Sequence, residues 1–335
     1  MVKLELRMKK DIAKILFVVA VVFTLTLAVH HQSYASPTDF IIEMSPENPG
    51  PNENVNAKII TYSFDINRAD ISWLINGQKK DSGIGKSSFS FKTGEVGSKT
   101  TLTVSIITKD GLPASKSIII RPADVDLLWE AANYVPPTYK GKALPSSEST
   151  IKVIAMPNIV SPGGNKILPS NLVYQWEINN KKFPDVSGYG KSSFTFRSSE
   201  IFNEDSISIT VSDFSQTVVA SKRIKIKIES PKIIFYENRP IEGVLYDNAL
   251  SGETQLGSDE ISVKAEPFFF SKRNMGRLNY EWTMNGEKIS PDTEPSIVTL
   301  RTGGGSGSAN IGLRISNLIS ILQFAEKSLM INYGQ

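Results

Sequence analysis

One short pattern occurs three times in the chain and constrains its fold more than any other feature. A tryptophan stands at positions 73, 176 and 282, and each is followed three residues later by asparagine and then by glycine or asparagine. Apolar and more polar residues alternate around each tryptophan, which is the pattern of a strand with one buried face, and the Asn-Gly or Asn-Asn pair indicates a hairpin turn. The copies begin about 100 residues apart, the length of one β-sandwich domain.

The alternation continues in a common order around each tryptophan. In the first copy, Val55, Ala57 and Ile59 precede the tryptophan, and residues 102–106 alternate after it. No stretch shows helical periodicity of useful length, so the expected fold class is all-β, with three tandem β-sandwich domains after an N-terminal signal peptide. The expected boundaries are 1–35 for the signal peptide, 36–122 for the first domain, 123–230 for the second and 231–335 for the third.

From about residue 40 to residue 335, the chain resembles the immunoglobulin-like and PKD-like sandwich repeats of exported bacterial surface proteins. The resemblance rests on the Trp-x-Ile/Met-Asn-Gly/Asn motif, on about seven strands per hundred residues and on the tandem copies. The cysteine pair of antibody-type domains and the Trp-Asp-Phe-Gly-Asp-Gly signature of PKD repeats are both absent from the sequence. The resemblance implies three tandem immunoglobulin-like β-sandwich domains that act as a spacer, adhesin or assembly component, and it identifies no active residue.

The first 35 residues have the pattern of an export signal. Basic residues precede an apolar run over residues 15–29, and residues 33–35 (Ser-Tyr-Ala) supply small side chains at both positions that cleavage requires. The run is shorter than the roughly 20 residues that span a bilayer. We therefore expect cleavage between Ala35 and Ser36 and a protein that is extracellular, at the cell surface or in the periplasm. In this case the protein contacts a membrane only transiently, through the signal segment. The alternative is that this segment is not cleaved and remains as a membrane anchor.

The absence of cysteine and the position of the histidines exclude several classes of catalytic site. The sequence has no cysteine, and its two histidines, His30 and His31, both lie in the export signal. The mature chain then lacks the groups for Ser-His-Asp triads, Cys-His pairs, and zinc, haem or iron–sulfur sites with His or Cys ligands. We expect no cofactor, no metal site and no enzymatic activity. A glycosidase needs only two carboxylates, so a carbohydrate-active protein remains the alternative.

Charge gives no indication of nucleic acid as a partner. The net charge of +3 arises within residues 1–35, and the remaining basic and acidic residues balance. Nucleic-acid binding needs clustered positive charge, which this distribution does not provide. The expected partner is an unidentified protein or envelope component.

Several motifs admit a functional and a structural interpretation. Gly-Lys-Ser occurs at residues 85–87 and 190–192, but the glycine that a phosphate loop needs five residues earlier is missing, and a strand follows where that loop requires a helix. A turn before a strand is the favoured interpretation of both. The glycines of residues 303–307 indicate a flexible loop, and the acidic pairs lack the spacing of a calcium loop. Because the tryptophans alternate with apolar neighbours, we expect them in the core.

Two apolar loops of the third repeat are less easily explained by a soluble domain. One precedes the tryptophan strand, and the other occupies the last hairpin, where the first repeat has Lys-Asp-Gly at residues 109–111. Both are expected at the same end of the sandwich, where they form either an inter-domain contact with residues 139–144 or a partner-binding site. The candidate interface residues are Phe268, Phe269, Phe270, Ile319, Ile321, Leu322 and Phe324.

Overall fold

The computed structural model describes residues 38–334 with the exception of residue 201 and residues 292–293. The expected signal peptide, residues 1–35, lies outside the described residues. The described part consists almost wholly of strands, and its only helical segments are short 3-10 turns, so the all-β prediction is confirmed. No helix among these residues has the length and apolar character needed to cross a membrane. The 3-10 turns are η1 (Ile66–Arg68), η2 (Pro169–Asn171), η3 (Pro184–Val186) and η4 (Lys272–Arg277).

The chain divides into two compact units. One contains Ala57–Phe89 and Thr103–Ser117, together with the segment that ends at Glu43. The other contains Met44–Asn56, Ser90–Leu102 and Ile118–Gln335. The second unit therefore holds the second and third sandwiches and the junction between them, whereas the strands of the first sandwich are divided between the two units.

The first sandwich has sheets of order β1-β2-β5 and β4-β3-β6-β7. Trp73 on β3 is fully buried, and its ring stacks on Phe89 of β5 with 5.6 Å between centroids. This ring contact joins one sheet to the other. The strands are β1 (Ile41–Ser45), β2 (Asn54–Ile60), β3 (Asp70–Ile75), β4 (Gln78–Ile84), β5 (Ser88–Lys92), β6 (Thr100–Ile107) and β7 (Pro113–Ile120).

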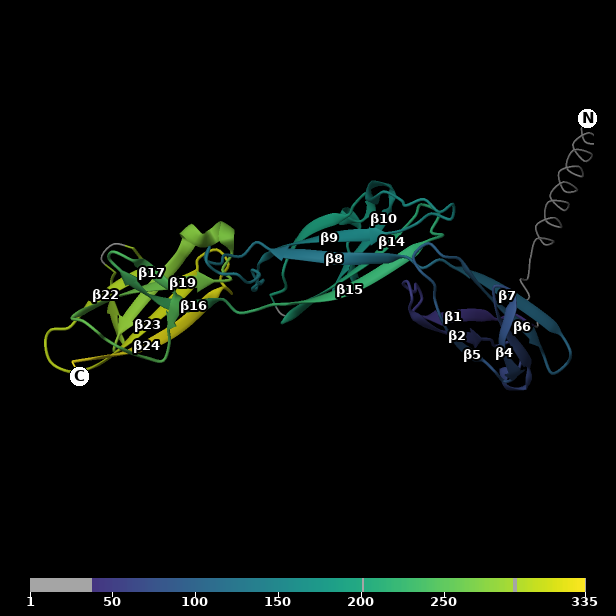
Figure 1. Cartoon of the computed structure of the whole chain (residues 1–335), viewed down its shortest axis with the longest axis horizontal. Helices are drawn as coiled ribbons and strands as arrows, with labels where there is room; N and C mark the ends of the chain where they lie inside the picture. The colour runs from purple at the N-terminus through teal and green to yellow at the C-terminus, as the bar shows by residue number, and fades with distance from the viewer. Residues whose placement is uncertain (1–37, 201, 292–293, 335) are drawn as a thin grey trace, which may run out of the picture. The chain divides into compact units, whose positions relative to one another are not determined.

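The second sandwich packs the sheet β11-β10-β14-β15, with β12 also paired to β10, against the sheet β13-β9-β8 (Figure 1). Trp176 on β10 pairs with Ile209 on β14, and its ring lies 4.7 Å from that of Phe194 on β13, in the opposite sheet. The strands are β8 (Asp124–Ala131), β9 (Thr150–Asn158), β10 (Val173–Ile178), β11 (Lys181–Lys182), β12 (Gly188–Tyr189), β13 (Ser193–Arg197), β14 (Glu204–Ser212) and β15 (Val219–Lys227).

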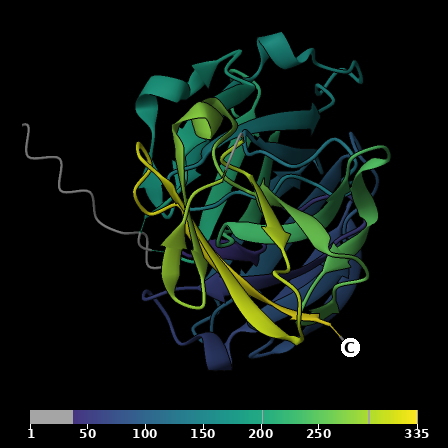
Figure 2. The same ribbon diagram turned by 90° about the vertical axis from the view of Figure 1, so that its left-hand side faces the viewer.

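The third sandwich faces the viewer in Figure 2 and packs the sheet β17-β16-β19-β22 against β18-β24-β23-β20-β21. Trp282 on β20 stacks on Phe235 of β16, again from the opposite sheet, at 5.7 Å between centroids. The strands are β16 (Lys232–Arg239), β17 (Gly243–Leu250), β18 (Glu253–Gln255), β19 (Glu260–Phe268), β20 (Leu278–Met284), β21 (Glu287–Ile289), β22 (Ile297–Arg301), β23 (Gly307–Asn317) and β24 (Phe324–Tyr333).

The repeated tryptophan motif has the same structural role in each sandwich. All three tryptophans are at most 1% exposed, which confirms that they are core residues. The asparagine that follows each adopts a positive φ, as the central residues of a type I′ hairpin must. Each indole N–H donates to a backbone carbonyl, at 2.8 Å, in the turn that leads into the next long strand; the acceptors are Lys86 O, Lys191 O and Pro295 O. The first two acceptors are the lysines of Gly-Lys-Ser, so these motifs are turns that satisfy a buried indole.

Candidate interaction surface

The second and third sandwiches are joined by backbone hydrogen bonds as well as by the linker. After β8, the chain runs antiparallel to the segment between β19 and η4, with a bridge between Asn133 and Ser271. Tyr134 N–H donates to Phe270 O at 2.7 Å, and Phe269 N–H donates to Tyr134 O at 2.8 Å. Lys272 N–H completes this ladder by donating to Ala132 O at 3.0 Å. The pairing fixes the register of one sandwich end against the other.

Phe269 is held at this junction in an unusual backbone conformation. Its φ of 66° lies in the left-handed region, which aromatic residues rarely adopt and which costs on the order of 1–3 kcal/mol. Its carbonyl accepts hydrogen bonds from Asn133 Nδ2 and, at 2.8 Å, from Ser146 Oγ of the second sandwich. Both donors are buried, so these bonds form away from water and compensate for the backbone strain.

The phenylalanine run lies inside the junction. Phe268 and Phe269 are each 4% exposed and meet Tyr139 of the second sandwich edge to face, with 5.4 and 6.4 Å between centroids. Phe270 is fully buried in the core of the third sandwich. These three candidate interface residues therefore face the 139–144 segment or the core, and they are not available to an external partner.

A buried carboxylate adds a polar contact to the junction. Glu266 on β19 is 5% exposed and accepts hydrogen bonds from Tyr246 Oη at 2.8 Å and from Tyr134 Oη, across the junction, at 3.2 Å. Burial and the adjacent Glu266 carboxylate raise the pKa of Tyr134 to about 12. Both tyrosines therefore remain neutral donors to this carboxylate across the physiological pH range.

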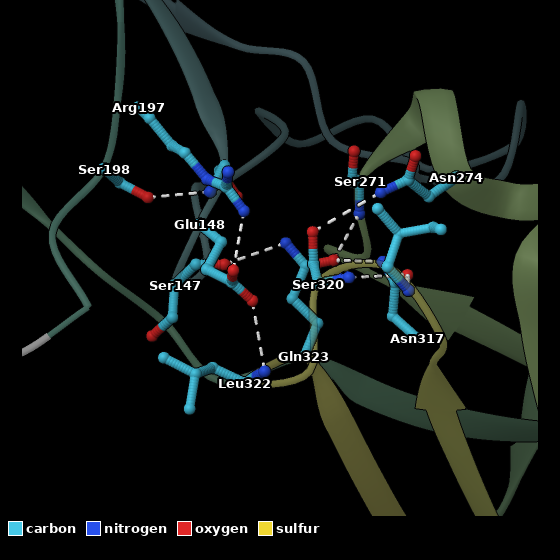
Figure 3. A network of polar contacts seen from close by, with 12 residues as sticks. Ser147, Glu148, Arg197, Ser198, Ser271, Asn274, Asn317, Ser320, Leu322 and Gln323 are labelled. Carbon is cyan, nitrogen blue, oxygen red and sulfur yellow. Dashed lines mark hydrogen bonds and ion pairs between the residues drawn. The ribbon is translucent and has the colours of Figure 1, made fainter.

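The β23–β24 hairpin approaches the second sandwich through a polar network, shown in Figure 3. Gln323 is fully buried; its Nε2 donates to Ser147 O at 2.8 Å, and its Oε1 accepts from Ser271 N–H and Asn317 Nδ2, both at 2.9 Å. Glu148 Oε2 accepts from Leu322 N–H at 3.1 Å, while its Oε1 pairs with Arg197 at 2.6 Å. The hairpin is thus held by buried polar groups of both sandwiches.

The apolar side chains of the same hairpin point away from this network. Ile319 and Ile321 are 60% and 75% exposed, and Leu322 and Phe324 are 41% and 48% exposed. Leu318, which the sequence analysis did not include among the site residues, is also 64% exposed. We call these five residues the apolar tip. The structure separates the two expected apolar loops, because the phenylalanine run is buried whereas the apolar tip is not.

Sequence reasoning did not identify the polar residues that hold the junction. These residues are Asn133, Ser146, Glu148, Glu266 and Gln323, and nothing in their spacing or their neighbours in the sequence marks them as buried. Only the change from polar to apolar hairpin loops between repeats pointed to this end of the third sandwich.

Two hollows of the third sandwich are candidate small-molecule sites. One of about 440 Å³ opens beside Gly303 and Gly304 and is walled by Leu256, Leu300 and Tyr333, with no carboxylate among the described residues that line it. The other, also about 440 Å³, lies at the β16–β17 turn and contains Glu237, Glu242 and Glu260. No group of three potential metal ligands occurs among the described residues.

The carboxylates of the second hollow are already paired. Arg239 contacts Glu237 and Glu242, both at 2.8 Å, and Arg301 pairs with Glu260. All three carboxylates of this hollow are therefore held by arginine side chains.

The sheets and the repeated core define the class of the protein, an array of immunoglobulin-like β-sandwich domains. No protein-family model matches the chain, and no curated protein matches it. Among solved structures, the three N-terminal domains of the highly immunogenic outer capsid protein of bacteriophage RB49 share 10% identity, with 88% of this chain and 98% of that chain covered and a TM-score of 0.26. The central fibronectin-III array of RIM-binding protein shares 12% identity, with 89% and 96% covered and a TM-score of 0.29.

A third similar structure contains a carbohydrate. It is SGBP-B of the Bacteroides ovatus mixed-linkage glucan utilization locus in complex with a mixed-linkage heptasaccharide. It shares 12% identity, with 85% of this chain and 64% of that chain covered and a TM-score of 0.21.

Proposed function

We propose that this chain is an exported, non-enzymatic binding protein that acts as a spacer, adhesin or assembly component of the cell surface or envelope. Its immunoglobulin-like sandwiches form the scaffold, and the apolar tip of the third sandwich is the binding surface. The observation that supports this proposal is the exposure of five large apolar side chains on one short hairpin, since soluble proteins rarely leave such a patch uncovered.

The architecture of the junction supports the same role. A binding loop acts best when a rigid scaffold holds it, because less conformational freedom is lost when it meets its partner. Gln323 and Glu148 hold the hairpin from both sandwiches. The tip therefore presents a preformed surface, with the second sandwich as part of its support.

Capture from native envelopes tests this function. The tagged mature chain should retain envelope components, whereas Ile319→Ser combined with Ile321→Ser should lose most of them. The matched control is Ile241→Ser, which changes an apolar side chain that is 98% exposed at the β16–β17 turn. Equal capture by all three proteins would contradict the assignment of the tip as the binding surface.

Export is tested separately by N-terminal sequencing of the protein recovered from its native host. Cleavage at the predicted site gives a chain that begins at Ser36. A chain that still begins at Met1 or Met8 would replace the secreted form with an anchored one.

A carbohydrate-binding role is the second candidate, favoured by the hollow that contains Glu237, Glu242 and Glu260. Carboxylates bind sugar hydroxyls through hydrogen bonds, and this role does not require a protonated acid. Glycan-array binding that is lost in Glu237→Gln and Glu260→Gln, but not in Ile319→Ser, would favour it over the apolar tip.

A further inference from the structure

The apolar tip inverts the usual distribution of polar and apolar side chains. Ser320 and Gln323 are at most 3% exposed, whereas the residues between and beside them, Ile319, Ile321 and Leu322, are 41–75% exposed. Asn317, at the base, is 2% exposed. The buried polar groups occupy the interior side of the hairpin, so the apolar side chains cannot turn inward without displacing a hydrogen-bonded network.

Five backbone N–H groups of the hairpin, those of residues 318, 319, 320, 322 and 323, have partners within the protein. Ile319 and Ser320 N–H donate to Asn317 Oδ1 at 3.0 and 3.1 Å, and Gln323 N–H donates to Ser320 O at 2.9 Å. The N–H groups of Leu318 and Leu322 donate to Arg277 O and Glu148 Oε2. Transfer of these five groups to a medium without water leaves none of them unpaired, which lowers the cost of bringing the hairpin to lipid.

Cationic side chains lie on the segment beside the tip. η4 contributes Lys272, Arg273 and Arg277, all exposed, and the Leu318 N–H bond to Arg277 O places the end of η4 against the base of the hairpin. Asn274 Nδ2 contacts Ser320 Oγ at 3.4 Å, so the middle of η4 also borders the tip. Within the described part of the chain, none of these three cations forms an ion pair, which leaves them available to negative charge.

We propose that the apolar tip inserts into the surface of a bilayer that contains anionic lipids, with Lys272, Arg273 and Arg277 against the headgroups. This inference rests on the proposed function, since it names the partner of the same surface. It also replaces the expectation that the protein meets a membrane only through its N-terminal segment. Aliphatic side chains at the acyl boundary together with basic residues at headgroup level are the combination that holds peripheral proteins on anionic membranes.

A bilayer fits this surface better than a folded protein does. Protein interfaces add directional hydrogen bonds at their centre, and they favour tyrosine, tryptophan and arginine there. The apolar tip offers few such groups, because five backbone N–H groups of the hairpin already have partners and four of the five side chains of the tip are aliphatic. Insertion into lipid needs no directional hydrogen bonds, and its free energy depends on the apolar area that leaves water.

Vesicle flotation of the exported form, which begins at Ser36, tests the proposal. Every described strand follows this position, so all three sandwiches are retained. We expect flotation with vesicles of phosphatidylcholine and phosphatidylglycerol, and much less with phosphatidylcholine alone. Ile319→Ser with Ile321→Ser should abolish flotation, and Ile241→Ser should not.

The cationic side chains are tested by removing their charge. Lys272→Gln, Arg273→Gln and Arg277→Gln together should weaken binding to the anionic vesicles roughly 100-fold, since each basic residue near the surface contributes about a factor of five. The matched control is Lys79→Gln, Lys80→Gln and Lys92→Gln, which removes three exposed lysines of the first sandwich. Unaltered melting temperatures show that each variant is folded.

Insertion itself is tested by fluorescence. Ile321→Trp should shift its emission to shorter wavelength when anionic vesicles are added, because the indole leaves water, and Ile241→Trp should not. The lipid proposal is overturned by the absence of flotation with anionic vesicles, or by flotation that the serine variants leave unchanged. If vesicles fail while envelope capture still depends on Ile319 and Ile321, the proposed function stands and the partner is a protein.

Discussion

The hairpin loops after β14 and β23 occupy equivalent places in the second and third sandwiches, and each is closed by a buried polar side chain at its first position. Asp213 accepts from Val218 N–H at 2.8 Å and from the hydroxyl of Thr217 at 2.7 Å. Asn317 likewise accepts from the N–H groups of Ile319 and Ser320. The local closure of the two loops therefore follows one rule, in which a side-chain oxygen substitutes for a backbone partner.

What differs is where the rest of each loop makes its contacts. The Asp213 loop closes on itself through Ser215, Thr217 and Val218 and carries a single exposed apolar side chain, Phe214. In the β23–β24 hairpin, by contrast, Gln323 donates a hydrogen bond to Ser147 O of the second sandwich, and the apolar tip is exposed. Because both loops are closed in the same way, their remaining residues can differ. One loop is an ordinary turn, and the other carries the proposed binding surface and is held by the second sandwich.

The largest expected effect tests whether the tryptophan-centred cores of the second and third sandwiches are equivalent. Trp176→Ala and Trp282→Ala should each cost about 3–5 kcal/mol of unfolding free energy, because each indole fills the space between its sheets and satisfies a turn carbonyl. Urea unfolding with probes in each sandwich measures this. A cost of less than about 1 kcal/mol for one of the two substitutions would show that the two cores are not equivalent; Ile241→Ala is the exposed control.

The next largest effect on stability is expected at Gln323, whose contact with the second sandwich distinguishes the β23–β24 hairpin from the Asp213 loop. Gln323→Ala should cost about 1–3 kcal/mol, since it leaves Ser147 O, Ser271 N–H and Asn317 Nδ2 without their partner. Hydrogen exchange should accelerate at residues 318–323, and the Asp213 loop should be unaffected. Unchanged exchange at the tip would mean that Asn317 alone holds the hairpin.

Acid should affect the Asp213 loop selectively. Burial by itself would raise the pKa of Asp213, but hydrogen bonds from Val218 N–H and the Thr217 and Ser215 hydroxyls outweigh it, so the pKa lies below its ordinary value. The stability from this carboxylate is present above the pKa of the unfolded state, near 3.9, and is lost as pH falls through the folded value.

A comparison of wild type with Asp213→Asn measures this contribution. The difference in melting temperature should be largest near neutral pH and should shrink below about pH 4. Asn317 does not ionise, so Asn317→Ala should show a difference that is independent of pH in this range. A constant difference for Asp213→Asn would contradict the role of the carboxylate charge.

The smallest effect on stability is expected at the apolar tip. Ile319→Ser with Ile321→Ser should change the unfolding free energy by no more than about 0.5 kcal/mol, because both side chains are already exposed. Calorimetry checks this, and Phe214→Ser is the matched change in the Asp213 loop. A loss of several kcal/mol would show that the tip packs against the protein in solution.

The repeat allowed much of the fold to be predicted. Alternation around Trp73, Trp176 and Trp282 identified the strand, its buried face and the hairpin that follows, because these depend on neighbours in the chain. The same local reasoning identified Gly-Lys-Ser as a turn. The change from a polar to an apolar last hairpin also directed attention to the third sandwich.

The division of the apolar residues was decided by tertiary structure. In the sequence, Phe269 and Ile321 belong to equally apolar loops, yet one is buried against the second sandwich and the other is exposed. The outcome depends on Asn133, Ser146, Glu148 and Gln323, polar residues whose partners are more than 120 positions away.

The sequence by itself determined the strands, the turns and the tryptophan-centred cores, since period and turn chemistry act within a few residues. Only the tertiary structure decided which apolar loop became a junction and which became a surface. The physical reason is that a buried hydrogen-bonding group stabilises a contact only where a complementary group meets it, and no local pattern specifies which distant groups meet.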